Sequence, residues 1–167
     1  MKRIIITTGS AFALVLALIT TVATAKVDFS GVWALDKSSS EGLPPDMDQT
    51  MIVVQTGDKL SLETKLITGK GEQTVADTYL LDGKEVEFTP KSPNGLSGKG
   101  KRTAKWTTDG NGIDVNEKVT FDTPEGSVTV QTTRKWTLSA DGKTIKIELN
   151  TQDPNGMHQS KRTFNKK

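Results

Sequence analysis

Cysteine is absent from this chain, and histidine occurs once, at position 158. Without cysteine there are no disulfides and no thiol chemistry, and a single histidine argues against a site for a soft metal. We therefore expect no metal and no cofactor. The sequence also lacks the motifs of serine hydrolases, zinc proteases and phosphate-binding loops, so it offers no catalytic motif.

The chain also lacks an excess of charge once its first residues are set aside. It has 22 basic and 20 acidic residues, and Lys2 and Arg3 precede an apolar run that ends at Ala23-Thr24-Ala25. This pattern is typical of a cleaved signal peptide over residues 1–25, with a retained membrane anchor as the alternative. We expect export to the periplasm or extracellular space, without stable membrane insertion after cleavage. The balanced charge that remains gives no electrostatic footprint for nucleic acid.

Helical periodicity is missing after the signal, where short runs of period-two hydrophobicity alternate with turn sequences. The first strand is predicted over residues 26–36, since Phe29 and Trp33 fall on one face. Residues 37–48 are expected to form the longest loop, because they contain Pro44-Pro45 and several small polar residues. Further strands are predicted at 49–55, 59–68, 72–81, 84–90, 101–108, 112–122, 127–139, 143–151 and 157–165.

These strands predict an all-β fold with a single domain over residues 26–167. About ten strands joined by short turns form an antiparallel up-and-down meander, which usually covers its edges by closing into a barrel. A two-sheet β-sandwich is the alternative. Successive turns lie at alternate ends, so the Gly-Asp and Asp-Gly turns gather at a tight end. The long loop and the Pro-x-Gly turns gather at a looser end, where a mouth would lie.

Large aromatic side chains are few, and the predicted register gathers them at the tight end. The predicted members of this plug are Trp33, Trp106, Trp136, Arg162 and Phe164. Trp106 and Trp136 come just before Asp-Gly turns, and buried aromatics of this size would close the end of a barrel. Arg134 shares a face with Trp136, so we expect a guanidinium to stack on Trp33 or Trp136.

Asp77 and Glu117 interrupt apolar faces near the middle of their predicted strands. Matching the apolar faces of the hairpin around Pro124 puts Glu117 opposite Thr132 and diagonal to Arg134, within reach of a long side chain. Three interpretations are open at this point. The charges form an internal ion-pair network, anchor the head group of a ligand, or act as an acid–base pair in hydrolysis.

Two stretches resemble exported bacterial lipocalin-like proteins, which are calycin-type barrels. They are DFSGVWALDKSSS at residues 28–40, which holds a Gly-x-Trp motif, and WTLSADGKTIKI at residues 136–147. The resemblance implies a barrel closed at one end by a tryptophan and a late-strand arginine. The chain departs from true lipocalins in having no cysteine, no C-terminal helix and about ten strands rather than eight. Fatty-acid-binding barrels match that strand count, but their helix pair has no counterpart in residues 37–48.

The leading hypothesis is an exported, non-enzymatic barrel that binds a small apolar or amphiphilic molecule through its looser end. The predicted ligand-binding residues are Val53, Leu66, Val75, Asp77, Tyr79, Glu117, Phe121, Val130, Arg134 and Leu149. Among them Asp77, Glu117 and Arg134 would be the polar anchors. The second hypothesis is a barrel with a filled interior that serves as an interaction or inhibitor module of the cell envelope. An enzyme that uses Asp77 or Glu117 ranks last.

Overall fold

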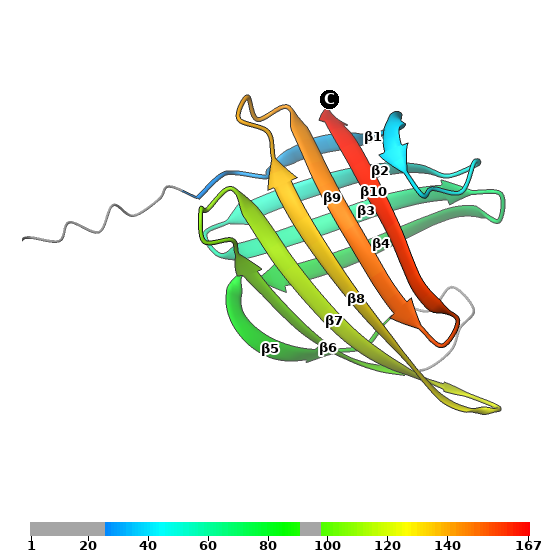
Figure 1. Cartoon of the computed structure of the whole chain (residues 1–167). Coiled ribbons are helices and arrows are strands. Elements are labelled where there is room, and N and C mark those ends of the chain that lie inside the picture. The colour runs from blue at the N-terminus through cyan, green and yellow to red at the C-terminus, as the bar shows by residue number, and fades with distance from the viewer. Residues whose placement is uncertain (1–25, 91–97) are drawn as a thin grey trace, which may run out of the picture.

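The computed structural model describes residues 26–90 and 98–167, in which ten β-strands follow one another (Figure 1). They are β1 (Gly31–Glu41), β2 (Asp48–Thr56), β3 (Lys59–Thr68), β4 (Gly71–Leu80), β5 (Asp82–Phe88), β6 (Gly98–Trp106), β7 (Gly112–Thr123), β8 (Gly126–Leu138), β9 (Thr144–Asp153) and β10 (Gly156–Lys166). Within the described residues, no helix has the length and hydrophobicity needed to span a membrane. The predicted signal peptide at residues 1–25 and the predicted turn at Pro93-Asn94-Gly95 lie outside the described residues.

All ten strands belong to one antiparallel sheet that curls into a nearly closed barrel (Figure 1). The order along the sheet is β4-β3-β2-β1-β10-β9-β8-β7-β6-β5, so the first and last strands pair with each other. Strands that follow each other in the chain also pair, except β4 and β5, which lie at the two ends of the sheet. The predicted all-β meander, closed as a barrel rather than split into a sandwich, is confirmed.

Alternation of side chains separates the inner and outer faces of the wall. In β8, Trp136 and Leu138 are buried, whereas Lys135 and Thr137 beside them are exposed. A period of two is what a pleated strand imposes, so hydrophobic alternation was a sufficient signal for most strands. The strand predicted at 59–68 coincides with β3, and most of the others differ from the structure by a few residues at their ends.

The largest departure from the predicted strands is β1. It continues through Lys37–Ser40, which the sequence assigned to the long loop, while residues 26–30 precede it. The carboxylate of Asp36 explains the extension, since it accepts hydrogen bonds from the backbone and hydroxyl of Ser38 at 3.0 and 2.6 Å and of Ser39 at 3.2 and 2.9 Å. These bonds satisfy a backbone that bulges away from β10. They also lower the pKa of Asp36 to about 2.

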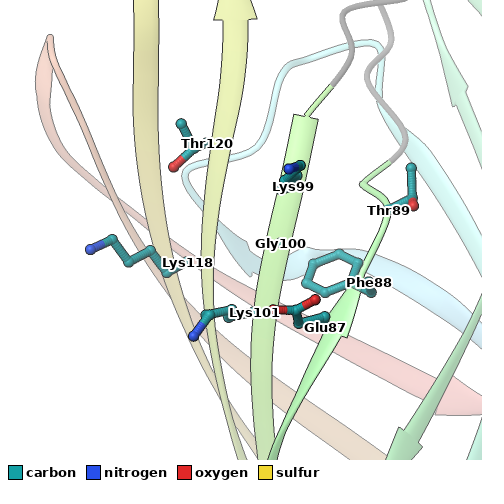
Figure 2. Close-up of a pocket in the computed structure, with 8 residues that line it drawn as sticks. All are labelled: Glu87, Phe88, Thr89, Lys99, Gly100, Lys101, Lys118 and Thr120. Atoms are coloured by element: carbon teal, nitrogen blue, oxygen red, sulfur yellow. The ribbon is translucent and has the colours of Figure 1, made fainter.

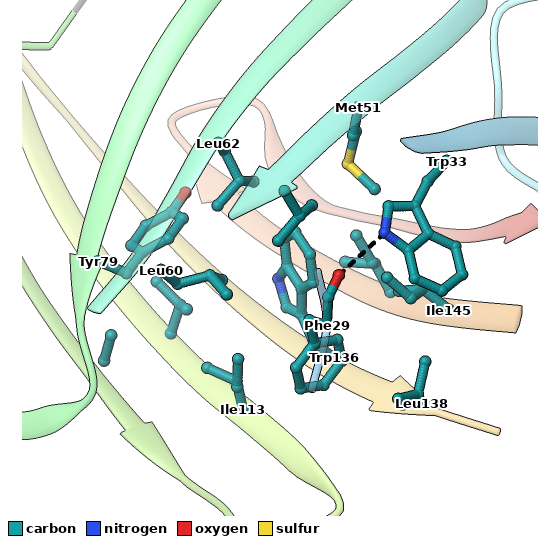
Figure 3. Packing of buried hydrophobic residues seen from close by; sticks show 14 of the residues in the cluster. Phe29, Trp33, Met51, Leu60, Leu62, Tyr79, Ile113, Trp136, Leu138 and Ile145 are labelled. Atoms are coloured by element: carbon teal, nitrogen blue, oxygen red, sulfur yellow. Dashed lines mark hydrogen bonds between the residues drawn. The ribbon is translucent and has the colours of Figure 1, made fainter. Parts of the chain in front are cut away.

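The hydrophobic core fills the tight end of the barrel, around the segment that leads into β1 (Figure 3). Phe29 and Trp33 are fully buried, and the Phe29 ring centroid lies 6.2 Å from the rings of both Trp106 and Trp136. The Phe29 carbonyl accepts a hydrogen bond from Trp33 Nε1 at 3.0 Å. The Gln55 side chain fixes the same segment, because it accepts a hydrogen bond from the Phe29 N–H at 3.0 Å.

The predicted plug residues occupy different depths in this core. Trp33, Trp136 and Phe164 are 0%, 2% and 0% exposed, respectively. Trp106 packs at the edge of the core and donates from Nε1 to Asp58 at 2.9 Å. Arg162 lies outside it, beside a cavity described below. Phe29, which the period-two pattern placed on the inward face without assigning it to the plug, lies at its centre.

The cations that stack on the plug differ from the prediction. The Lys166 ammonium lies 5.2 Å from the ring centroid of Trp33, and the Lys26 ammonium lies 5.3 Å from that of Trp106. The guanidinium that was expected on Trp33 or Trp136 is therefore replaced by lysines at the barrel end. Their position suits a long side chain that packs along a ring while its charge stays in water.

Phe29→Ala is expected to lower the free energy of unfolding by about 3–5 kcal/mol, because it leaves a cavity among buried aromatic rings. The matched control is Val32→Ala in β1, at a side chain that is 38% exposed. That change should stay within about 0.5 kcal/mol. Urea unfolding followed by far-ultraviolet circular dichroism measures both, and equal losses would contradict a central role for Phe29.

Candidate functional site

Two cavities lie in the barrel interior above the plug. The inner cavity, of about 210 Å³, lies against the core between Gln49, Trp136 and Arg162. The side cavity, of about 260 Å³, lies between Phe88 and Phe121. Three residues line both cavities, namely Val75, Asp77 and Arg134. The barrel is therefore solid at the tight end and partly open above it.

The structure brings most of the predicted ligand-binding residues to these cavities. Those that line at least one of them are Val75, Asp77, Tyr79, Glu117, Phe121, Val130, Arg134 and Leu149. Leu66 instead lines a hollow of about 640 Å³ between the β1–β2 loop and the β3–β4 turn. Val53, also predicted to bind the ligand, is 1% exposed and belongs to the packed core at the tight end.

Four charged side chains form a network across the interior. Glu117 accepts hydrogen bonds from Arg102 Nε and from Arg134 Nη1, and Arg102 Nη2 lies 3.1 Å from Asp77 Oδ1. The side chains of Arg102 and Glu117 are each 7% exposed. Two positive and two negative charges balance, which is what buried charges require. Of the interpretations left open by the sequence, the internal ion-pair network is present, with Glu117 opposite Thr132 as predicted.

The pKa values of Arg134, which belongs to the network, and of Tyr79, which lies beside it, are both raised. Burial disfavours the charged form of Arg134, but interactions with Tyr79 and Glu117 outweigh burial and raise the pKa of Arg134 above its usual range. For the Tyr79 phenol, burial raises the pKa, because it disfavours the charged phenolate. Arg134 therefore stays charged and Tyr79 stays neutral at any physiological pH.

Arg102 is the principal residue that the sequence analysis left out of the site. Its guanidinium lies over the rings of Tyr79 and Phe88, 4.4 and 4.1 Å from their centroids. Arg102 Nη1 also donates to the Thr78 carbonyl at 3.3 Å. Gly100 makes room for the Phe88 ring, which a Cβ at that position would approach to less than 3 Å. Alternation along β6 puts Arg102 on the same face as Ala104, but it gives no information about contacts across the barrel.

A fifth charge, Arg162 on β10, has no carboxylate partner in the described part of the chain. Its Nη1 donates to Gln49 Oε1 at 2.9 Å, while its Nε is buried without a partner among the described residues. Burial, together with the nearby charge of Arg134, lowers the pKa of Arg162. Trp136 Nε1 is also buried without a partner, and both residues line the inner cavity. Two residues that line the inner cavity thus each have a buried donor without a partner among the described residues, and one of them, Arg162, has an uncompensated positive charge.

A hollow of about 760 Å³, larger than either interior cavity, lies on the outer wall over β5–β7 (Figure 2). The exposed lysines Lys99, Lys101 and Lys118 surround it, and Lys101 pairs with Glu85 at 2.8 Å. Flexible, solvated lysines of this kind do not fix a ligand, so we interpret the hollow as charged surface. His158 is exposed too, and residues 26–90 and 98–167 contain no cluster of His, Asp or Glu side chains suited to a metal ion.

Comparison with known proteins agrees with this geometry. No protein-family model and no curated protein sequence matches the chain. The solved structure of zebrafish ileal bile acid-binding protein complexed with cholic acid has a TM-score of 0.52, covers 83% of this chain and 98% of its own, and is 18% identical.

The fold is a lipocalin-like, calycin-type barrel. Secretory abundant heat soluble protein 4 from Ramazzottius varieornatus is also similar, with a TM-score of 0.53, coverage of 88% of this chain and 99% of its own, and 14% identity. The resemblance predicted from residues 28–40 and 136–147 is thus confirmed at the level of the fold. Within this calycin-type barrel, the cavities and their charges distinguish this chain.

Glu117→Gln is expected to lower the free energy of unfolding by about 3–5 kcal/mol, because it leaves the buried guanidinium of Arg102 and the half-buried one of Arg134 without their shared carboxylate. Asp77→Asn should cost less, since the Asp77 side chain is 36% exposed and its pair with Arg102 is partly solvated. Urea unfolding of the two variants measures the difference. A larger loss for Asp77→Asn would contradict the central position of Glu117.

Proposed function

We propose that the barrel binds one small amphiphilic molecule in its interior and holds an anionic or oxygen-rich head group at Arg162. The observation that carries this proposal is a pair of buried donors on two residues that line the inner cavity. Arg162 Nε and Trp136 Nε1 are buried without partners among the described residues. A buried donor that lacks an acceptor costs free energy, so a ligand oxygen that supplies the acceptor is strongly favoured.

The charge balance of the interior supports an anionic head group. Asp77, Glu117, Arg102 and Arg134 neutralise one another, whereas Arg162 has a neutral partner, Gln49. An anion beside Arg162 would complete the balance. The polar anchor therefore differs from the expected set, because Asp77, Glu117 and Arg134 serve the network and Arg162 remains for the ligand.

The apolar lining of the side cavity supports an amphiphilic ligand. Val75, Phe121 and Val130 are half-buried there, so a ligand could cover apolar surface that water now contacts. Leu149 extends this apolar lining into the inner cavity. The two cavities share residues, and together they reach the range of small-molecule sites, about 300–1,000 Å³.

Structural similarity to a solved protein and the sequence of residues 1–25 add two points to the proposal. The similar zebrafish protein was solved in complex with cholic acid, which agrees with an interior site in a calycin-type barrel. We also propose that the protein acts as a carrier or sequestering protein rather than an enzyme. Export to the periplasm or extracellular space is part of the proposal, and it rests on the signal-like pattern of residues 1–25.

Arg162→Met is expected to weaken binding of 8-anilinonaphthalene-1-sulfonate, an apolar anion that fluoresces in apolar sites, by about tenfold, the equivalent of one charged hydrogen bond. The matched control is Lys161→Met, the neighbouring residue on β10, whose side chain is 61% exposed. It should bind the probe as the wild type does. Because Arg162 carries a half-buried, uncompensated charge, Arg162→Met should also leave thermal stability unchanged or higher.

Fluorescence titration gives the affinities, and displacement of the probe tests the head group. An alkyl carboxylate should displace it better than the alcohol of equal chain length, and Arg162→Met should abolish that preference. No saturable binding of the probe, or wild-type affinity in Arg162→Met, would refute the proposed site.

A further inference from the structure

The barrel wall has a seam between β4 and β5. These strands follow each other in the chain, yet they lie at opposite ends of the sheet and share no ladder in the described part of the chain. Each of the other intervals of the wall is a ladder of backbone hydrogen bonds. At the seam, β4 approaches β6 instead. Any passage through the wall is therefore easiest at this place.

The side cavity reaches the seam from the interior. Val75 and Asp77 lie on the inner face of β4 and are half-buried, whereas Ala76 between them is exposed on the outer face. All three line the side cavity, so the cavity extends around the edge of β4. Phe88 and Thr89 line it on the opposite side, at the end of β5.

One side chain, Arg102, bridges this interval. It bonds to Asp77 and to the Thr78 carbonyl on β4, at 3.1 and 3.3 Å, and it stacks on Phe88 of β5. The Asp77 end of the bridge is partly solvated, so this ion pair is weak and open to exchange with water. A side chain changes rotamer quickly, whereas opening a ladder breaks several backbone hydrogen bonds at once. The Arg102 bridge therefore opens more easily than any ladder of the wall.

The looser end of the barrel is held by backbone contacts. The loop at residues 42–47 connects β1 to β2, and Asp46 in this loop accepts a hydrogen bond from the Gly69 N–H in the β3–β4 turn. At its other end, Gly42 lies so close to β10 that an added Cβ would come 3.2 Å from Ser160 Cα. The loop is therefore fixed at both of its ends across this side of the mouth.

We propose that the ligand enters and leaves through the seam between β4 and β5, with the Arg102–Asp77 pair as the closing contact. The inference rests on the proposed function, since it concerns the ligand of the same interior site. The side cavity and the inner cavity share three lining residues, so a head group that has passed the seam must move past these side chains to reach Arg162. The apolar part of the ligand then lies in the side cavity, closest to the seam.

The natural absence of cysteine allows a direct test with single-cysteine variants. Ala76→Cys, labelled with a bulky maleimide, blocks the outer side of the seam. The matched control is Thr74→Cys with the same label, on the same exposed face of β4 but away from the side cavity. Stopped-flow fluorescence follows association and dissociation of 8-anilinonaphthalene-1-sulfonate in each labelled protein.

The seam label should slow association and dissociation of the probe about tenfold, because an obstructed path affects both directions alike. The label at Thr74→Cys should change neither rate. Rates at Ala76→Cys that equal those of the control would overturn the seam as the path.

A disulfide between Asp46→Cys and Gly69→Cys tests the mouth independently. A Cβ at position 69 would lie 3.5 Å from Asp46 Cγ, so the two side chains are close enough to be joined. Exchange of the probe should be the same with this bond oxidised or reduced, and slowing only in the oxidised form would identify the mouth as the path. Equilibrium titration keeps the two proposals separate. Normal affinity for the probe together with unaltered exchange rates in labelled Ala76→Cys overturns the seam alone. Absence of probe binding to the unmodified protein overturns the proposed function.

Discussion

The buried contact between Arg102 and Glu117 holds in place the side chain that crosses from β6 to β4, two strands that share no backbone ladder in the described part of the chain. The two residues face each other on β6 and β7, Arg102 continues to β4 and β5, and Glu117 continues to Arg134 on β8. Charges in such a place are tolerated when each has a partner of opposite sign and its hydrogen bonds are satisfied. That requirement constrains the side chains on five neighbouring strands. It also means that ion pairs between side chains, rather than backbone hydrogen bonds, close the wall between β4 and β5.

The packed core and the cavities are separated along the barrel axis. At the tight end, Phe29 and its aromatic neighbours fill the interior, and fully buried apolar side chains supply the hydrophobic free energy of the fold. Above them the ion-pair network divides the remaining space and leaves Arg162 uncompensated. A buried charge without a counter-ion detracts from stability, and such a cost is characteristic of residues retained for a function.

The strands and the barrel followed from local patterns in the sequence, whereas contacts across the barrel did not. Period-two hydrophobicity and turn residues located the hairpins, and hairpin register placed Glu117 opposite Thr132. The bulge at Asp36 depended on side-chain hydrogen bonds that loop composition concealed. Two features depend on which strands approach each other through the interior: the Arg102 bridge to β4 and the lack of a counter-ion for Arg162. The periodicity of a sequence does not give distances between strands across a barrel.

The pairing of β1 with β10 brings together residues as far apart in the chain as Trp33 and Lys166. Hairpins such as β7–β8 close short loops and form quickly, but this pairing must wait until nearly the whole chain is available. Barrel closure is therefore a late event in folding, and it coincides with the burial of Phe164 beside Leu35. Until then the inner faces of the early strands stay exposed, so the growing chain passes through an interval in which its apolar surface is open to aggregation or to a chaperone.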